Sequence, residues 1–321
     1  MSATRVAVIG GGANCEHDVS LASAAAVIAA LTTAGYAVVP LTIGRDGTWR
    51  YAGRTPIGLA RSVEVLQSCA AAVPVLHGPH GEDGTLAALL DLAGVPCVGS
   101  PLSAGALAMD KWATKLVAEA VGIRTAPGRV VTARTRAAIE AEPFAGPVVV
   151  KPVAAGSSHG VSRVSSDRAL RIALDAAFSL DSRVLVEDFV LGREIDLAVL
   201  GRADGTRYVA PALQIVKNER DIFDLASKYD GSARFLVPAP LEDAQRKELE
   251  GAAVAIYDAL GCACVARIDF FWTQDGPVLN EVNTMPGFTE HSQVPRMFAA
   301  AGTSYPDLLD LLVRDTLERH R

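Results

Sequence analysis

The segment 266–283 holds the clearest chemical pattern in the chain. Asp275-Gly276 is a turn dipeptide between two apolar runs, which predicts a β-hairpin. A turn centred there places Asp269 opposite Glu281 and Arg267 opposite Asn283, and the strand period of two brings these four side chains to one face. The alternating apolar residues should then face the core: Ile268, Phe270 and Val282.

This arrangement predicts a metal site. Two opposed carboxylates repel each other unless a cation lies between them, and two acids with an amide oxygen suit a hard ion such as Mg²⁺. Asp269, Glu281 and Asn283 are therefore the candidate ligands of a metal–phosphate site. The alternative is a solvated hairpin face on which Arg267 forms a salt bridge.

A second pattern indicates phosphate binding. The apolar run from Val148 ends in Lys151 and is followed by a loop of small residues that includes Gly156-Ser-Ser158. Small residues let backbone N–H groups approach phosphate oxygens, and a lysine supplies a point charge. The segment lacks the ending of a P-loop, and a plain surface turn is the alternative.

Three further segments hold polar groups in loops. Glu16 follows a strand and three glycines, which places its carboxylate at the ligand-binding edge of an α/β sheet, although solvation before the next helix would also explain it. His77 and His80 follow another strand in a glycine-rich loop, where hydrogen bonding is a commoner role than metal binding. Lys228-Tyr229 lies in a charged segment that is either a lid over a site or an ordinary solvated loop.

Composition limits the class of protein. With 321 residues, of which 50% are hydrophobic, the chain is long enough for two or three domains with sizeable cores. The net charge of −6 and scattered basic residues argue against nucleic acid as a partner. Five widely spaced cysteines read as reduced thiols, and neither a signal peptide nor a membrane span is evident, so we expect a cytoplasmic protein.

The element pattern predicts an α/β fold in three parts. Short β-rich runs alternate with helical patterns at the start of the chain, which is typical of a parallel sheet; Ser20 should cap the first helix and Gly35 should end it. Glycine, serine and proline at 99–103 mark a boundary, followed by one helix from Ala104 to Val121. We predict a Rossmann-like domain at 1–102, a small α+β domain with an antiparallel sheet at 103–186, and a larger α+β domain at 187–321.

Taken together, the motifs resemble those of the D-alanine–D-alanine ligase family of the ATP-grasp superfamily over nearly the whole chain. They occur in family order, with the metal-site hairpin followed by Thr284-Met-Pro-Gly287. The other matching segments are Gly11-Gly-Ala-Asn-Cys-Glu-His-Asp-Val-Ser20, Leu76-His-Gly-Pro-His-Gly-Glu-Asp-Gly-Thr85, Met109-Asp-Lys111, Lys151-Pro with Gly156-Ser-Ser158, and Lys228-Tyr229.

The resemblance implies an ATP site and a metal site. Lys111 and Lys151 would contact the phosphates, and Lys228 would also bind the nucleotide. The residues implied around adenine and ribose are Glu187, Phe189, Val190 and Glu194. The implied cofactors are ATP and two Mg²⁺ ions, with Mn²⁺ as an alternative, held by Asp269, Glu281 and Asn283.

The resemblance also implies substrate residues. Glu16 would bind the ammonium of the first D-alanine, His77 would line that subsite, and Ser292 would receive the carboxylate of the second D-alanine. The remaining implied catalytic residues are Ser157 and Tyr229, which would fix Glu16 and the mobile loop, and Arg267 with the Gly287 N–H, which would stabilise an oxyanion.

The implied reaction joins two D-alanines through a D-alanyl phosphate for peptidoglycan precursor synthesis, in a homodimeric enzyme. Gln293 stands where the family usually has leucine, which would make the second subsite more polar and D-serine conceivable there. Two alternatives are an ATP-grasp ligase with other amino-acid substrates and a non-catalytic nucleotide-binding module. Glu16, Tyr229 and Ser292 argue against the first, and the intact acids with Arg267 argue against the second.

Overall fold

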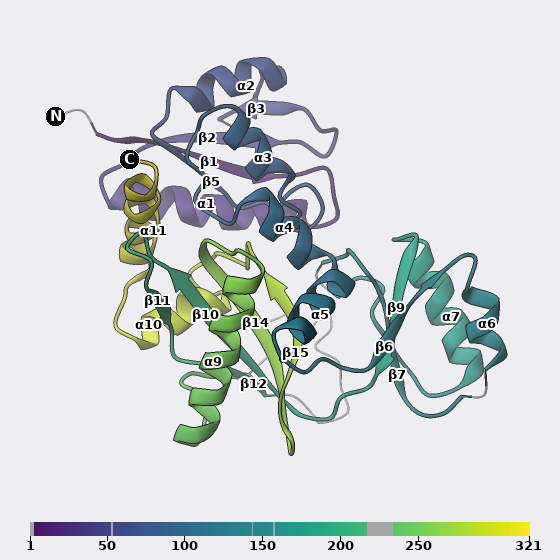
Figure 1. Ribbon diagram of the computed structural model, residues 1–321. Helices are drawn as coiled ribbons and strands as arrows, with labels where there is room; N and C mark the ends of the chain where they lie inside the picture. The colour runs from purple at the N-terminus through teal and green to yellow at the C-terminus, as the bar shows by residue number, and fades with distance from the viewer. Residues whose placement is uncertain (1–2, 53, 143, 157, 217–233) are drawn as a thin grey trace.

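The computed structural model describes residues 3–52, 54–142, 144–156, 158–216 and 234–321. Its strands form three sheets, of five, six and four strands. In Figure 1 the N-terminal sheet lies above the six-stranded sheet, and the four-stranded sheet stands to one side beyond α5. The mixed α/β class predicted from the sequence is confirmed.

The five-stranded sheet has the order β4-β3-β2-β1-β5. Strand β1 pairs in parallel with β2 and β5, as predicted, whereas β3 and β4 add an antiparallel edge that the sequence pattern did not predict. The strands are β1 (Arg5–Gly11), β2 (Ala37–Ile43), β3 (Trp49–Tyr51), β4 (Thr55–Pro56) and β5 (Ala71–Pro74). The helices around it are α1 (His17–Thr33), α2 (Gly58–Gln67) and α3 (Thr85–Leu92).

The start of α1 differs from the prediction. The residue at the N-cap is Glu16, and Ser20 lies inside the helix, so the expected cap at Ser20 is wrong. The buried Ser20 hydroxyl accepts from the Gly11 N–H (2.9 Å) and donates to the Val75 carbonyl (2.6 Å). It therefore ties the helix to the end of the sheet, while Gly35, with φ +90°, follows the helix end as expected.

The single helix predicted from Ala104 to Val121 is two helices, α4 (Leu102–Met109) and α5 (Lys111–Ala120). Asp110 between them has extended backbone, and its side chain accepts from the Ala113 N–H at 2.9 Å. An aspartate side chain can accept a hydrogen bond from a free backbone N–H at the start of a helix, so aspartate is favoured at this capping position. The break places Lys111 at the start of a new helix, where it faces the cavity described below.

The four-stranded sheet is antiparallel, as predicted, in the order β6-β9-β7-β8. It comprises β6 (Gly128–Thr132), β7 (Val148–Pro152), β8 (Ser162–Val164) and β9 (Arg183–Asp188), with α6 (Arg136–Ala141) and α7 (Asp167–Phe178). Glu187 belongs to this sheet through β9, at the boundary predicted between residues 186 and 187. The domain limits themselves stay a prediction.

The six-stranded sheet is the structural centre. It comprises β10 (Arg193–Gly201), β11 (Arg207–Val209), β12 (Leu213–Val216), β13 (Arg234–Leu236), β14 (Cys264–Thr273) and β15 (Gly276–Asn283). Between β13 and β14 lies α9 (Asp243–Ala259), and α10 (Gln293–Ala300) and α11 (Tyr305–Arg319) follow β15. One core joins this sheet to α1, β1, α10 and α11, and a second lies on the side of α4, α5 and α9.

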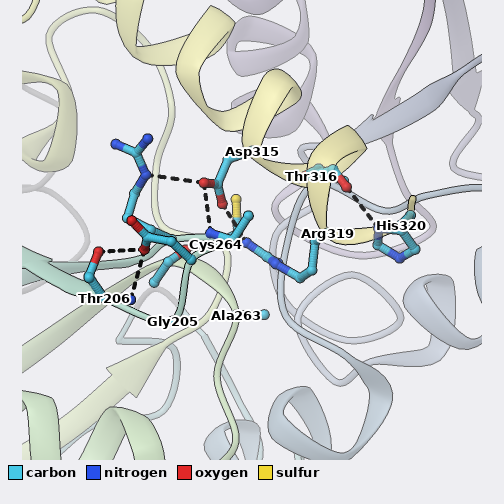
Figure 2. A network of polar contacts seen from close by, with 12 residues as sticks. Gly205, Thr206, Ala263, Cys264, Asp315, Thr316, Arg319 and His320 are labelled. Atoms are coloured by element: carbon cyan, nitrogen blue, oxygen red, sulfur yellow. Dashed lines mark hydrogen bonds and ion pairs between the residues drawn. The ribbon is translucent and has the colours of Figure 1, made fainter.

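A polar network fixes α11 to the six-stranded sheet (Figure 2). The buried Asp315 carboxylate accepts from Arg202 Nε (3.1 Å) and from the Ala203 N–H (2.8 Å). Arg319 then donates to Asp315 (2.7 Å) and to the Gly201 carbonyl (3.2 Å). Because α11 also packs on α1, this network helps to hold the N-terminal sheet against the six-stranded sheet.

None of the helices in the described part of the chain has the length and apolarity needed to cross a bilayer.

Candidate active site

Two cavities meet at the centre of the molecule. The first, which we term the inter-sheet cavity, lies between the four-stranded and six-stranded sheets and is lined by Lys151, Glu187 and Asp269, among others. The second, the loop cavity, has a volume of about 620 Å³ and is lined by loops that follow β1 and β5 and by the loop before α10. Among the described residues, five line both cavities: Lys111, Ala155, Arg267, Glu281 and Gln293.

The β14–β15 hairpin has the register predicted from the sequence. Asp269 lies opposite Glu281, and Arg267 lies opposite Asn283. The turn itself is one residue earlier than expected, because Thr273 pairs with Gly276. A bulge next to Asp269 shifts the pairing by one residue and brings the acids opposite each other.

The hairpin acids surround one arginine. Arg267 Nε and Nη2 donate to the two oxygens of Asp269, each at 2.7 Å, and Asn283 Nδ2 donates to Asp269 at 3.1 Å. Glu281 is 4.0 Å from Arg267 Nη2. Burial alone would lower the pKa of Arg267. The neighbouring carboxylates, Asp269 first, outweigh this effect and raise the pKa above its ordinary value. The salt bridge of the alternative is present, between Arg267 and Asp269, but its solvated face is wrong: Asp269 is 4% exposed, and the predicted core residues are buried.

A second ion cluster lies on the opposite wall of the inter-sheet cavity. Glu187 on β9 pairs with Lys151 on β7 (2.5 Å) and with Lys115 on α5 (3.0 Å). Burial favours a raised Glu187 pKa, yet the two lysines outweigh it and hold this pKa below its ordinary value. Lys111, one helical turn before Lys115, donates to the Ala155 carbonyl at 2.8 Å and lies 3.7 Å from Glu281.

Other residues of the implied nucleotide site line the same cavity. Phe189 and Val190 follow β9, and Glu194 lies on β10. Arg163 stacks over the Phe189 ring at 4.1 Å from its centroid. The structure thus brings Lys111, Lys151, Glu187 and these three residues to one cavity, which supplies aromatic, apolar and cationic surfaces.

Glu16 enters the loop cavity at the N-terminus of α1 and is 5% exposed. Its carboxylate lies close to two glycines, Gly78 and Gly156; a Cβ added at Gly156 would approach Glu16 Oε2 to 2.6 Å. Gly156 belongs to the loop that was predicted to approach phosphate. The absence of a side chain there is therefore also needed to make room for Glu16.

His77 is buried on the same side. Its Nδ1 lies 3.2 Å from the Met285 carbonyl and 3.7 Å from Glu82, and its Nε2 lies 3.1 Å from the Ser23 hydroxyl. Burial lowers the His77 pKa, but Glu82 more than offsets this and raises it overall; burial raises the pKa of Glu82. His77 is thus a hydrogen-bonding residue of the cavity wall.

The opposite end of the loop cavity is formed by the turn before α10. Ser292 occupies the N-cap of α10, and its hydroxyl accepts from the Thr289 N–H at 3.0 Å. A Cβ at Gly287 would lie 3.2 Å from Ser292 Oγ, so the Gly287 backbone and this hydroxyl are adjacent. Gln293 begins the helix and contacts Arg267.

Ser157, Lys228 and Tyr229 lie outside the described residues. Three described residues of the site were missed by sequence reasoning: Asp196, Lys115 and Glu82. Asp196 is two positions after Glu194 in an apolar strand, and Lys115 is four positions after Lys111 in a helix, so periodicity places each on the face of its predicted neighbour.

The donor set fits a hard cation on the hairpin. Two carboxylates and one amide share a face of the hairpin, where Asp269 lines the inter-sheet cavity, Asn283 lines the loop cavity and Glu281 lines both. This is the oxygen chemistry that Mg²⁺ prefers. Within the described ranges no group of three or more His, Cys, Asp or Glu side chains gathers for a metal. The predicted trio holds two acids and an amide, Asn283.

The fold and the two meeting cavities define an ATP-grasp ligase. The four-stranded and six-stranded sheets enclose a cavity with a cationic wall, and an acidic hairpin lies at its junction with a second, substrate-sized cavity.

Comparisons with known proteins identify the family. The model of the D-ala D-ala ligase C-terminus matches residues 117–314, and that of the N-terminus matches 5–62 and 55–100. A D-alanine–D-alanine ligase from Corynebacterium aurimucosum is 38% identical over 98% of both chains. The chain belongs to the D-alanine–D-alanine ligase family, and it is an enzyme that joins two D-alanines at the expense of ATP.

Solved structures of two ligases share the fold. The VanG D-Ala:D-Ser ligase from Enterococcus faecalis superposes with a TM-score of 0.85 at 34% identity, covering 98% of this chain and 99% of that one. The D-alanine–D-alanine ligase from Bacillus anthracis complexed with ATP has a TM-score of 0.80 at 28% identity, covering 99% of each chain.

Proposed function

We propose that ATP occupies the inter-sheet cavity, that both D-alanines occupy the loop cavity, and that the reaction takes place where the two cavities meet. One observation carries this proposal: Lys111, Arg267 and Glu281 line both cavities. A phosphoryl group delivered from one side and a carboxylate presented from the other would meet beside these charges.

On the nucleotide side, Lys111 and Lys151 bind the phosphates. Both side chains are held by nearby oxygens, Ala155 and Glu281 for the first and Glu187 for the second. Pre-positioned cations of this kind neutralise charge without reorganisation during the reaction. Phe189, Val190, Glu187 and Glu194 surround the adenine and ribose, and Lys228 adds a further nucleotide contact.

The metal ligands are Asp269, Glu281 and Asn283. Two Mg²⁺ ions, or Mn²⁺ in their place, would neutralise phosphate charge when bound there. The Asp269 carboxylate is already held by Arg267 and Asn283, which orients it toward the cavity wall that Glu281 also lines.

The first step activates a carboxylate. Glu16 holds the ammonium of the first D-alanine, and His77 lines its subsite. A carboxylate oxygen attacks the γ-phosphorus, the bond from that phosphorus to the β,γ-bridging oxygen breaks, and ADP leaves as D-alanyl phosphate forms. Ser157 and Tyr229 are proposed, from the family resemblance, to hold Glu16 and close the site.

The second step forms the amide. Ser292 receives the carboxylate of the second D-alanine, whose amine attacks the acyl carbon. Arg267 and the Gly287 N–H stabilise the oxyanion of the tetrahedral intermediate, which collapses with loss of phosphate while the amine releases a proton. Loss of such a donor typically costs roughly 3–4 kcal/mol of barrier.

We further propose that the enzyme works in the cytoplasm as a homodimer and supplies the dipeptide for peptidoglycan precursors. Cytoplasmic location follows from the need for ATP, and the dimer and the pathway from the family resemblance. Sedimentation of the full chain at micromolar concentration tests the dimer directly, with a monomer as the contradicting result.

Phosphate release tests the substrate assignment. ATP and Mg²⁺ are supplied with D-alanine, D-serine, D-lactate and L-alanine, singly and in pairs, and products are identified by mass spectrometry. The proposal predicts D-alanyl-D-alanine from D-alanine alone and loss of turnover with a chelator. Preference for D-serine as the second substrate would instead identify Gln293 as part of a polar acceptor subsite.

A further inference from the structure

Gln293 makes two short hydrogen bonds in the wall shared by the two cavities. Its Oε1 accepts from Arg267 Nη1 at 2.7 Å, and its Nε2 donates to Asp196 Oδ2 at 2.6 Å. Only this orientation of the amide matches both neighbours, because a guanidinium only donates and an ionised carboxylate only accepts. Gln293 therefore links Arg267 to a carboxylate on a different strand.

The link completes the support of the Arg267 guanidinium. Asp269 holds one edge through Nε and Nη2, and Gln293 holds the remaining nitrogen, Nη1. Without Gln293 the guanidinium would be anchored along a single edge. A planar group held at both ends keeps its direction, and a misplacement of about 1 Å at a reacting centre can cost roughly 100-fold in rate.

Asp196 anchors the link to the rigid part of the fold. It lies on β10 directly opposite Asp269 on β14, and it is 1% exposed. Its Oδ2 is 3.8 Å from Arg267 Nε, farther than a hydrogen bond. Through Gln293, the fixed carboxylate of Asp196 therefore restrains the position of Arg267. Because the linking amide is neutral, it adds no further negative charge.

We propose that Gln293, anchored by Asp196, is a positioning residue that aims Arg267 at the oxyanion of the second step. The inference rests on the proposed role of Arg267 and deepens it. Gln293 then acts through Arg267, and its effect falls on amide formation more than on binding of D-alanine.

The test compares four purified variants with the wild-type enzyme. Gln293→Met has similar length and removes both hydrogen bonds. Gln293→Glu keeps an acceptor for Arg267 but sets a carboxylate against Asp196. In the double variant D196N/Q293E the amide and the carboxylate exchange places, which restores the link with the wild-type charge. Val294→Ala, beside Gln293 in the core, is the control for loosening of α10.

We expect Q293M to lower kcat for dipeptide formation by roughly 10- to 100-fold. The KM for D-alanine should change much less, and the yield of dipeptide per ADP should fall because the acyl phosphate is lost to water. Q293E should also lose activity, and D196N/Q293E should recover most of it. V294A should lower Tm with the wild-type yield of dipeptide per ADP.

Two results would overturn the inference. One is unchanged kcat in Q293M, whether or not the KM for D-alanine rises. The other is no recovery in D196N/Q293E when that protein is folded with wild-type affinity for ATP. Arg267→Lys distinguishes a failure of the proposed Arg267 role from a failure of the Gln293 inference. If R267K also leaves the dipeptide yield unchanged, the proposed role of Arg267 fails; if only R267K lowers it, the role stands and the Gln293 inference fails.

Discussion

The two walls of the inter-sheet cavity carry opposite charge balances. On the wall built from β7, β9 and α5, two lysines surround one glutamate, Glu187. On the wall built from β10, β14 and β15, one arginine faces three carboxylates, Asp196, Asp269 and Glu281. The first wall has the charge to accept a polyanion and the second to accept a cation, which supports the proposal that a nucleotide and metal ions occupy this cavity.

The two walls also differ in the step that they are expected to serve, ATP binding or ligation. Lys151 lines the inter-sheet cavity alone, whereas Lys111 and Arg267 line both cavities. Changes at Lys151 and at its neighbour Lys115 should therefore alter ATP affinity or fold stability, and changes at Arg267 should alter the ligation step.

The largest effect is expected from Arg267→Lys. Lysine keeps the charge but has no planar fork to bind Asp269 and an oxyanion together. We expect kcat for dipeptide formation to fall roughly 100- to 1,000-fold, as for other oxyanion donors, with little change in ATP affinity. Steady-state kinetics and calorimetric titration with ATP measure the two quantities, and a loss below about threefold in kcat would contradict the role.

Lys151→Met should weaken ATP binding by roughly 10- to 100-fold, since a hydrogen bond to a charged group contributes about 1.5–3 kcal/mol. Lys115→Met is the matched control, because both lysines bind Glu187 but Lys115 does not line the inter-sheet cavity. Equal loss of ATP affinity in the two variants would remove the distinction between a binding and a supporting lysine.

The same pair of variants should resemble each other in stability. Each leaves the buried Glu187 with one lysine in place of two, and we expect a loss of about 1–3 kcal/mol in the free energy of unfolding. Urea denaturation at neutral pH measures this loss. Wild-type stability in K115M would show that Lys151 alone satisfies Glu187.

The smallest effect is on the pH dependence of stability. The Glu187 pKa is lowered in the folded state, since its lysines outweigh the effect of burial. A depressed carboxylate stabilises the fold above its unfolded pKa, about 4.3, and this contribution is lost as pH falls through the folded pKa. In Glu187→Gln, the free energy of unfolding should therefore fall less steeply as the pH decreases. Urea midpoints measured below roughly pH 5 test this, and the same pH dependence in the variant and the wild type would argue against the lowered Glu187 pKa.

The hairpin was predictable because its chemistry is local. Asp269, Glu281, Arg267 and Asn283 belong to two adjacent strands, so turn position and a period of two define their relation. The bulge beside Asp269 was not predictable from the pattern, although it corrects the misplaced turn. Local propensity likewise suggested a cap at Ser20, which tertiary contacts with Gly11 and Val75 overrode.

The long-range partners could not be read from the sequence. Asp196 meets Gln293, 97 positions away, and Lys115 meets Glu187, 72 positions away. Such pairs depend on which strands become neighbours, and the pattern of one strand or helix gives only the face on which a residue lies. The resemblance to the family names residues that are proposed to bind ligands, but it does not name the residues that hold them in place.

Positional isotope exchange in oxygen-labelled ATP tests the central claim. This claim is that both steps take place where the two cavities meet, and that Arg267 acts in the second step and not in the first. Exchange in the presence of D-alanine reports reversible D-alanyl phosphate formation, and dipeptide yield reports the second step. The account predicts that R267K keeps D-alanine-dependent exchange while dipeptide formation collapses. Loss of exchange and dipeptide to the same degree, with ATP still bound, would contradict it.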